Sequence, residues 1–393
     1  MRVCFVAANS FALNAFLATP IEALAAAGWT ITVALNTQDG EVSEAVRRHA
    51  HVVPLPINRN ISPLADLPVL RELARLCRRE RFDVIHSITP KAGVLAMTAG
   101  LLAGVPVRMH TFTGQVWATR RGALRLFLKL MERYVARCAT HVLADSRSQA
   151  DFMVAHGTAS AQRMEVLGAG SICGVDMQRF RPRPEAIAAV RGRLGIPLDA
   201  IVVLFVGRLH PDKGLAELGR AFEEVAARRP GVHLVLVGPD EGGLARLQEG
   251  VALARDRVHA VGRSAEPELY MAAADLLCLP SYREGFGLSL LEAAATGLPV
   301  LATRIYGIVD AVENQETGLL VPARDSAALA HALDRLAGDA ALRTRLGRAG
   351  RERAERVFSK EMMQVAWRGL YERQLRQVPA AKRNAGNAEA GTR

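Results

Sequence analysis

Residues 276–303 have the sequence LLCLPSYREGFGLSLLEAAATGLPVLAT, and this stretch decides the fold class. The apolar run Leu276–Leu279 predicts a buried strand, Leu288–Thr296 predicts a helix, and Val300–Ala302 predicts a second strand. A strand, a helix and a strand in this order form a parallel βαβ unit. Ligands of such sheets bind beyond the carboxyl ends of the strands, so the loop at 280–287 is the first place to look for a site.

The same alternation of short apolar runs and longer helical patterns extends over most of the chain. Further candidate strands are Arg2–Val6, Thr30–Leu35, Val52–Leu55, Val84–Ser87, Val107–His110, His141–Ala144, Ile201–Val206, His233–Val237 and Val258–Val261. Further candidate helices are Phe16–Ala27, Pro68–Glu80, Gly93–Ala103, Leu124–Arg137, Leu215–Arg229 and Pro267–Ala274. The strands are apolar on both faces, so we predict an α/β protein with doubly wound parallel sheets.

The pattern starts again in the second half of the chain, after a polar stretch that contains prolines. A chain of 393 residues also exceeds the size of one typical core, roughly 250–300 residues. We therefore place a first domain at 1–180 and a second at 181–359, with a linker near 178–196. A helix over 360–377 follows, with a return to the first domain as one option, and 378–393 has too few apolar residues to be ordered.

The composition favours a protein with anionic partners. The formal net charge is +11 and aromatic residues make up only 5%, which suits phosphorylated ligands or anionic lipid better than an aromatic-rich nucleic-acid surface. The five cysteines have no metal-ligand or redox spacing, and the N-terminus resembles a strand rather than a signal peptide, so we expect a cytoplasmic location. The longest apolar stretch, Val94–Val107, is shorter than the roughly 20 residues that span a bilayer.

A first candidate site is the sequence VGRLHPDKG, residues 206–214. A strand ends there and a loop offers Arg208 and Lys213 before the next helix. Two cations five residues apart, with glycines beside them, can both reach one diphosphate, because Arg supplies a planar fork and Lys a mobile point charge. The alternative is a pair of solvated surface cations.

The second candidate is the sequence SYREGFGLSLLEAAATGLPV, residues 281–300, in which a tight loop is followed by a helix. Gly285 and Gly287 allow a ligand to approach the backbone closely, and the free N–H groups of Leu288 and Ser289 open a helix, where a phosphate is favoured. Glu284 and Glu292 frame this loop and could accept hydrogen bonds from a sugar and from a ribose. An ordinary exposed helix glutamate is the alternative for Glu292.

A dinucleotide-binding loop for hydride transfer is a competing interpretation of GFGLS in the same stretch. The third glycine of that fingerprint is missing, and the next strand, PVLAT, does not end in an acidic residue. We therefore disfavour a hydride-transfer enzyme.

Together, GRLHPDKG and EGFGLSLLEAAATGLPV resemble the motifs of the retaining glycosyltransferases of family 4. The resemblance implies the GT-B fold, two Rossmann-like domains that face a central cleft. It implies that Arg208 and Lys213 hold the donor diphosphate, that Glu284 contacts the transferred sugar, and that Glu292 holds the ribose. Catalytic roles fall on Glu284, Arg208 and Lys213, and the wider donor site then comprises Gly207, Gly262, Arg263, Gly285, Phe286, Gly287, Leu288 and Ser289.

Further segments, SITPKAG, VRMHTFTGQVWATRRG, THVLADSRSQADF and GSICGVDMQRF, resemble a narrower group. That group comprises bacterial transferases that build capsule or O-antigen on a polyprenyl-diphosphate carrier and often move N-acetylated hexosamines. The resemblance gives His110 a catalytic contact to the donor sugar, and gives Lys91 and Thr113 a role in acceptor binding. The alternatives are a strand-end histidine bonded to backbone and a surface lysine.

Cations recur every four residues within 120–137, at Arg121, Arg125, Lys129, Arg133 and Arg137. Apolar residues lie between them, and the pattern stays on one face of a helix. This face could lie on an anionic membrane, near a lipid-held acceptor, which would make the protein peripheral on the inner face of the cell membrane. The alternative is a solvated helix face over the core.

The sequence and the resemblance together predict a retaining glycosyltransferase. The donor would be a nucleotide-diphosphate sugar, with UDP implied by the resemblance alone, and the acceptor a lipid-diphosphate-linked saccharide. No metal or other cofactor is expected, because the sequence has no metal-ligand spacing and no Asp-x-Asp motif after a strand. Two alternatives stay open: a nucleotide-sugar 2-epimerase on the same fold, and a basic nucleic-acid-binding protein, although no nucleic-acid-binding module is recognised.

Overall fold

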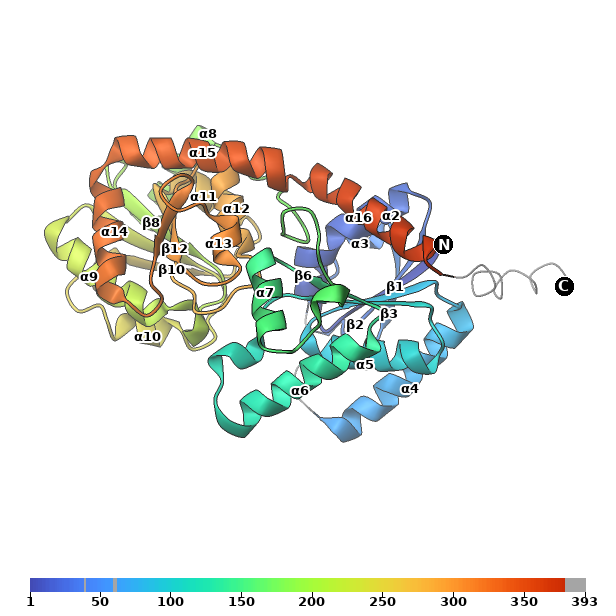
Figure 1. Ribbon diagram of the computed structural model, residues 1–393. Helices are drawn as coiled ribbons and strands as arrows, with labels where there is room; N and C mark the ends of the chain where they lie inside the picture. The colour runs from blue at the N-terminus through green and yellow to red at the C-terminus, as the bar shows by residue number, and fades with distance from the viewer. Residues whose placement is uncertain (39, 59–61, 379–393) are drawn as a thin grey trace, which may run out of the picture. The chain divides into compact units, whose positions relative to one another are not determined.

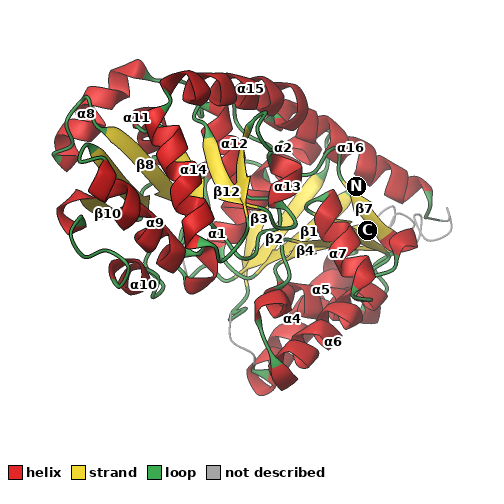
Figure 2. Cartoon of the chain, turned by 60° about the vertical axis from the view of Figure 1, so that its left-hand side comes forward, coloured by secondary structure: helices red, strands yellow, loops and turns green. Residues whose placement is uncertain are grey.

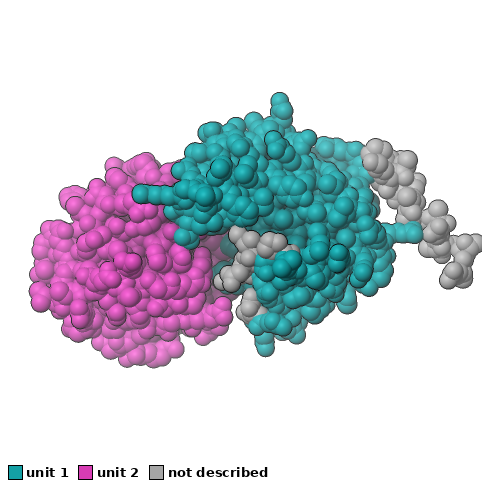
Figure 3. Space-filling model, turned by 90° about the horizontal axis from the view of Figure 1, so that it is seen from below, with its two compact units in different colours: residues 1–173, 360–393 teal, residues 174–359 magenta. Residues whose placement is uncertain are grey.

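The computed structural model describes residues 1–38, 40–58 and 62–378. It divides into two compact units, the first made of residues 1–173 with the chain from Lys360 onward, and the second of residues 174–359 (Figure 3). We placed the division at 180, whereas it lies after Cys173, because Val175 and Phe180 are buried in the core of the second unit. Of the tail expected at 378–393, residues 379–393 lie outside the described part of the chain.

The first unit is built on a seven-stranded sheet in the order β3-β2-β1-β4-β5-β6-β7, with every pairing parallel (Figure 1). Its strands are β1 (Arg2–Ala7), β2 (Thr30–Leu35), β3 (Ala50–Pro54), β4 (Val84–Ile88), β5 (Val107–Phe112), β6 (His141–Ala144) and β7 (Met164–Val166). Its helices are α1 (Ser10–Ala12), the π-helical η1 (Leu13–Leu17), α2 (Ala18–Ala26), α3 (Glu44–Arg47), α4 (Pro63–Glu80), α5 (Pro90–Leu102), η2 (Val116–Thr119), α6 (Gly122–Cys138), α7 (Arg147–Ala155), η3 (Ala161–Arg163) and α16 (Lys360–Arg376).

Both faces of this sheet are buried. Apolar side chains from α4, α5 and α6 form the core on one face, and side chains from α2 and α16 form the core on the other. In α16, Trp367 and Tyr371 are fully buried; the Trp367 Nε1–H donates to the carbonyl of Ile172 at 2.6 Å, and the Tyr371 hydroxyl lies 2.6 Å from Nδ1 of His86. Helix α16 is therefore part of the first unit.

The second unit has a six-stranded sheet in the order β10-β9-β8-β11-β12-β13, again parallel throughout. Helices lie on both sides of the strands (Figure 2). Its strands are β8 (Ile201–Val206), β9 (Val232–Val237), β10 (Val258–Gly262), β11 (Leu276–Leu279), β12 (Val300–Thr303) and β13 (Gly318–Val321). Its helices are α8 (Pro184–Leu194), η4 (Pro211–Lys213), α9 (Leu215–Arg228), α10 (Leu244–Gln248), η5 (Arg255–Arg257), α11 (Pro267–Ala273), α12 (Leu288–Ala295), α13 (Ile308–Ala311), α14 (Ser326–Gly338) and α15 (Ala340–Phe358).

The stretch we expected to be a linker contains the helix α8. Pro184 opens this helix, and Gly195, in the left-handed conformation at φ +66°, closes it. Arg191 is buried and donates hydrogen bonds to the carbonyls of Ala273, Leu198 and Ala200, and it pairs with Asp275 at 2.8 Å. The stretch that we expected to be a linker therefore holds a helix that is anchored inside the second unit.

The order of strands fixes where each unit can bind a ligand. In the second sheet the strand order reverses direction between β8 and β11, and in the first sheet between β1 and β4. Such a switch point leaves room beyond the carboxyl ends of two neighbouring strands, because their helices leave on opposite sides. The loops after β8 and β11 are the two motifs selected from the sequence.

Candidate functional site

The two motif loops of the second unit are packed against each other through backbone. Gly214 has φ +69°, and a Cβ there would lie 2.0 Å from the carbonyl oxygen of Pro280. The backbone N–H of Tyr282 donates to the carbonyl of Asp212 at 2.8 Å. Only glycine permits this approach, so Gly214 determines how closely the loop after β8 can lie to the loop after β11.

This packing brings Lys213 and Glu284 together. The Lys213 ammonium forms an ion pair with Oε1 of Glu284, and the Ser281 hydroxyl donates to the same oxygen at 2.7 Å. Ser281 is in turn held by Thr303, whose hydroxyl donates to its carbonyl. Both Lys213 and Glu284 are mostly buried, and Oε2 of Glu284 has no hydrogen-bond partner among the described residues, so this oxygen remains open to a further hydrogen-bond donor.

Arg208 also has a carboxylate partner, Glu241, in the loop after β9. The backbone of the loop after β9 packs closely against the backbone of the loop after β8, because a Cβ at Gly238 would lie 1.8 Å from the carbonyl oxygen of Gly207. Arg208 and Glu241 are both partly exposed. The two cations selected from the sequence are therefore each paired with an acid, and a diphosphate would have to share or replace those partners.

Helix α12 begins directly after the second motif. Its N-cap, Gly287, has φ +88° and supplies no side chain, so the first N–H groups of the helix, from Leu288 and Ser289, receive no side-chain cap. Gly285 is close to a third loop, because a Cβ at Gly307 would lie 2.6 Å from its carbonyl oxygen. These groups form a short backbone surface suited to an anion.

Phe286 was predicted to line the donor site. Its side chain is instead buried in the core of the second unit and packs edge-on against Phe358, with ring centroids 5.3 Å apart. Any contact of this residue with a donor would come from its backbone.

Two other residues predicted to lie in the donor site are at the end of β10. There, Gly262 has φ +77° and open space beside it, and Arg263 is exposed.

Glu292 lies within α12 and is partly buried. Burial raises the pKa of this carboxyl from 4.5 to about 7; the positive charge of Arg179 opposes the rise and the negative charge of Glu268 adds to it. Arg179 is itself bound to Glu268 at 2.9 Å. In the part of the chain that the structure describes, the Glu292 carboxylate accepts no hydrogen bond, so donors from a ligand would stabilise its charged form.

His110, in the first unit, is almost fully buried near the end of β5. Its Nδ1 lies 2.8 Å from the Ser87 hydroxyl on β4, and burial lowers the pKa of the imidazole to about 3. His110 is therefore neutral at any working pH. Its nearest polar contact is a side chain, not the backbone carbonyl considered as the alternative.

The acceptor candidates lie at the same end of this sheet. Lys91, in the first turn of α5, pairs with Asp66 of α4 at 2.7 Å, and Thr113 is partly buried just after β5. Thr89, the residue directly before α5, has φ +78°, which is rare for a residue other than glycine, and its hydroxyl oxygen is buried without a hydrogen-bond partner in the described chain. The loop between β4 and α5 is thus strained and carries an unsatisfied polar atom at the carboxyl edge of the sheet.

Two models of protein families match this chain. The model of glycosyl transferases group 1 matches residues 187–353, and the model of a glycosyl transferase 4-like domain matches residues 14–170. The capsular polysaccharide biosynthesis glycosyltransferase CapM of Staphylococcus aureus is 30% identical over 341 residues, which cover 86% of this chain and 88% of that protein. The chain belongs to the group 1 glycosyltransferases.

Two further similarities bear on fold and function. A UDP-Gal:alpha-D-GlcNAc-diphosphoundecaprenol alpha-1,3-galactosyltransferase of Escherichia coli is 28% identical over 72% of this chain and 74% of its own length. The sucrose-phosphate synthase of Thermosynechococcus elongatus has a solved structure that matches with a TM-score of 0.77 and 26% identity, over 95% of this chain and 98% of that one. The expectation of a GT-B fold with two parallel sheets is confirmed.

Helix α6 of this glycosyltransferase carries the basic repeat. Arg125 and Lys129 lie over the buried ring of Trp117, at 5.6 and 5.5 Å from its centroid, and the Trp117 Nε1–H donates to Glu132 at 2.6 Å. Four large apolar side chains of the same helix are 41% to 58% exposed: Leu124, Leu126, Phe127 and Leu130. Among the described helices, none has both the length and the apolar composition needed to cross a membrane.

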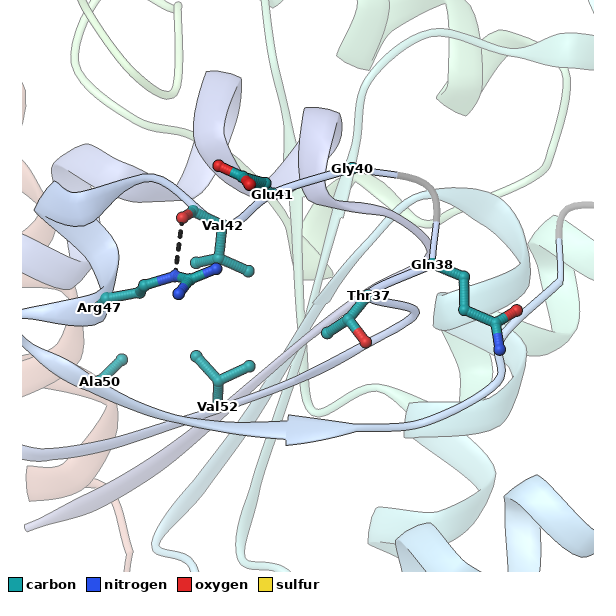
Figure 4. Close-up of a pocket in the computed structure, with 8 residues that line it drawn as sticks. All are labelled: Thr37, Gln38, Gly40, Glu41, Val42, Arg47, Ala50 and Val52. Atoms are coloured by element: carbon teal, nitrogen blue, oxygen red, sulfur yellow. Dashed lines mark hydrogen bonds between the residues drawn. The ribbon is translucent and has the colours of Figure 1, made fainter.

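A surface hollow of about 580 Å³ lies elsewhere on the first unit of the glycosyltransferase, between the loop after β2, α3 and the edge strand β3 (Figure 4). Thr37, Gln38, Glu41 and Arg47 supply its polar side chains, and the Arg47 Nε–H donates to the carbonyl of Val42 at 2.9 Å. None of the residues selected from the sequence lines it. We therefore do not place the donor in this hollow.

Sequence reasoning missed the residues that hold the selected ones in place. Ser281 could have been found, because it carries the first hydroxyl group after the predicted strand Leu276–Leu279 and begins the second motif. Glu241, Asp66 and Ser87 gave no signal, since each is far along the chain from the residue that it contacts.

Proposed function

We propose that this glycosyltransferase moves a sugar from a nucleotide-diphosphate donor, a UDP-sugar, with retention at the anomeric carbon. The observation that carries the proposal is the position of the Lys213–Glu284 pair beside the uncapped start of α12, at the switch point between β8 and β11. A diphosphate there would receive a positive charge and free N–H groups, and a sugar hydroxyl would reach the free oxygen of Glu284. The name of the Escherichia coli relative, which includes UDP-Gal, supports the choice of base.

The chemistry follows from the charges at this site. The bond between the anomeric carbon and the diphosphate breaks, the acceptor oxygen attacks from the same side, and a donor phosphate oxygen takes the proton of the acceptor hydroxyl. Arg208, Lys213 and the helix N-terminus stabilise the negative charge that develops on the leaving diphosphate, without a metal ion. Glu284 positions the sugar, and His110 contacts it.

For the acceptor we propose a lipid-diphosphate-linked saccharide. One relative has a name that includes a diphosphoundecaprenol acceptor, and Lys91 stands in the first turn of α5, where an anion is favoured. Thr113 would add a hydroxyl contact. An N-acetylated hexose as the transferred sugar, and assembly of a surface polysaccharide at the cytoplasmic face of the membrane, complete the proposal.

A screen of nucleotide-sugars tests this function directly. The protein should be stabilised by UDP and by one UDP-sugar, by about 2.7 kcal/mol at a hundred times the dissociation constant. It should then transfer that sugar to a polyprenyl-diphosphate-linked acceptor with retained anomeric configuration, and EDTA should not reduce the rate. Conversion of the UDP-sugar to its epimer without acceptor would favour the epimerase, and binding to nucleic acid with no response to any nucleotide would contradict the proposal.

The pKa of Glu292 predicts how donor affinity depends on pH. A ribose hydroxyl donates best to the ionised carboxylate, which is the minor form below about pH 7. The donor KM of the wild type should therefore fall about tenfold between about pH 6 and 8, whereas Glu292→Gln should show a weaker and nearly constant affinity. Steady-state kinetics with varied donor at saturating acceptor measure this.

Protein stability gives an independent check on Glu292. Because its pKa is raised on folding, the protonated carboxyl stabilises the fold fully below about pH 4.5, and this contribution is lost as the pH rises through about 7. Glu292→Gln should therefore raise the melting temperature more at about pH 8 than at about pH 5. Equal effects at both pH values would show that the carboxyl titrates normally.

We also propose that α6 rests on an anionic membrane. Its exposed Leu126 and Phe127 would enter the interface while the neighbouring cations face lipid phosphates. Leu126→Glu with Phe127→Glu should weaken binding to vesicles containing phosphatidylglycerol by about tenfold or more, because two apolar side chains lose their burial. Sedimentation with vesicles measures the bound fraction.

Leu198→Glu with Leu253→Glu, two exposed residues of the second unit, is the matched control and should bind vesicles like the wild type. Equal binding to vesicles of phosphatidylcholine alone would rule out the role of charge. Unchanged binding of the α6 variant would place the membrane contact elsewhere.

A further inference from the structure

Ser87 and His110 are direct neighbours on adjacent strands. The register of β4 and β5 pairs Ser87 with His110, and both side chains are buried. The Ser87 Oγ lies 2.8 Å from Nδ1 of His110. The hydroxyl has one other acceptor within reach, the carbonyl of Met109, at the much longer distance of 3.5 Å.

The imidazole of His110 cannot turn away from this contact. A Cβ on Gly93 of α5 would lie 2.5 Å from Cε1, so the helix backbone lies against the ring on one side. Phe112 packs edge-on against it, with ring centroids 4.4 Å apart and planes at 78°. Nδ1 is therefore held toward Ser87, while Nε2 has no hydrogen-bond partner among the described residues.

These contacts decide which nitrogen carries the proton. Since burial keeps the ring neutral, one nitrogen has a hydrogen and the other a lone pair. If Nδ1–H donated to Ser87, the serine hydrogen would be left with the Met109 carbonyl at 3.5 Å, too far for a good bond. If Ser87 donates to Nδ1, its hydrogen makes the 2.8 Å bond and the ring proton sits on Nε2.

We propose that Ser87 is a positioning residue that fixes His110 in the tautomer with its proton on Nε2, so that Nε2–H donates a hydrogen bond to an oxygen of the bound substrate. The identity of that oxygen, a hydroxyl of the transferred sugar, rests on the proposed function. The assignment of the tautomer does not depend on the proposed function, because the tautomer is a property of the free protein. Thr111 and His86 form a comparable pair on the other face of the same strands, with Thr111 Oγ1 2.8 Å from Nε2 of His86.

Nitrogen NMR of the free protein labelled with ¹⁵N-histidine tests the tautomer. Couplings of each nitrogen to the ring protons distinguish Nε2 from Nδ1, and comparison with His110→Gln assigns the signals. The wild type should show a protonated Nε2 and an unprotonated Nδ1 for His110. Ser87→Ala should change this pattern, and Thr111→Val should leave it as it is. A protonated Nδ1 in the wild type would overturn the inference.

A double-mutant cycle tests whether Ser87 acts through His110. Ser87→Ala should lower kcat for sugar transfer by roughly 10-fold to 100-fold, with a smaller change in donor KM, because the donor hydrogen bond is misdirected. In a His110→Ala background the same change should cost less than about twofold, since its partner is gone. Thr111→Val should stay within about twofold of its parent in both backgrounds.

An equal loss from Ser87→Ala in both backgrounds would show a merely structural role and would overturn the inference. The NMR measurement on the wild type decides the tautomer even if Ser87→Ala does not fold. A wild type that transfers no sugar but shows protonated Nε2 would contradict the proposed function and leave the tautomer assignment standing.

Discussion

Lys213→Ala should lower kcat for sugar transfer by roughly 10²–10³-fold, the effect of removing one preorganised charge from a transition state. The ammonium group is mostly buried, so its charge acts in a medium of low dielectric constant, where it stabilises a leaving diphosphate more than in water. The change also frees Oε1 of Glu284 from one of its two partners, which loosens the carboxylate that we propose positions the sugar. Single-turnover kinetics with saturating donor separate this loss from donor binding.

Arg228→Ala is a suitable control for charge, because this exposed arginine pairs with Glu224 at the far end of α9. It should keep kcat within about twofold, as expected for a surface ion pair. Lys213→Arg keeps the charge but replaces a point charge with a planar fork, and it should recover only part of the rate. A Lys213→Ala enzyme with wild-type kcat would remove this residue from the chemistry.

The second large effect is expected from Gly214→Ala, which should destabilise the second unit by about 2–5 kcal/mol. Left-handed backbone costs a residue with a Cβ roughly 1–2 kcal/mol, and forced overpacking adds roughly 1–3 kcal/mol. Here the overpacking is against the carbonyl oxygen of Pro280, which would lie 2.0 Å from the new Cβ. Relief of that clash separates the two motif loops, so turnover should fall together with the melting temperature.

Gly195→Ala separates these two causes. Gly195 has nearly the same φ, +66°, but a Cβ there would meet no atom within 4 Å. It should therefore lose only the backbone contribution, about 1–2 kcal/mol, and keep its kcat. Equal melting temperatures of the two variants would mean that the contact with Pro280 can relax, and that the loops are not held by this glycine.

Much of the fold could be predicted because apolar runs of four to six residues mark strands that are buried on both faces. β7 and β13 were missed, and both are edge strands; β7 contains the charged Glu165, which interrupts the apolar pattern. The helix α8 was not predicted, because the stretch that contains it is polar and has several prolines. In each case the deciding contacts are made with residues distant in sequence.

In the candidate site, too, local sequence patterns could be predicted, whereas contacts between residues distant in sequence could not. The loops of Lys213 and Glu284 were found from residue type and spacing, because glycines and charges after a strand are local signals. Their mutual ion pair, and that of Arg208 with Glu241, were not predicted, because the partners come from loops 71 and 33 residues away. The place of Phe286 in the donor site came from the family resemblance alone, and nothing local in the sequence shows that its side chain turns into the core.

The return of α16 to the first unit has a consequence for how the polypeptide folds during synthesis. The indole of Trp367 and the phenol of Tyr371 complete the apolar layer under β1 and β4, so that layer stays open until residues 360–376 have been synthesised. Residues 174–359 are contiguous and can fold earlier. A stop codon just before Lys360 would thus spare the second unit and expose the hydrophobic underside of the first unit to aggregation.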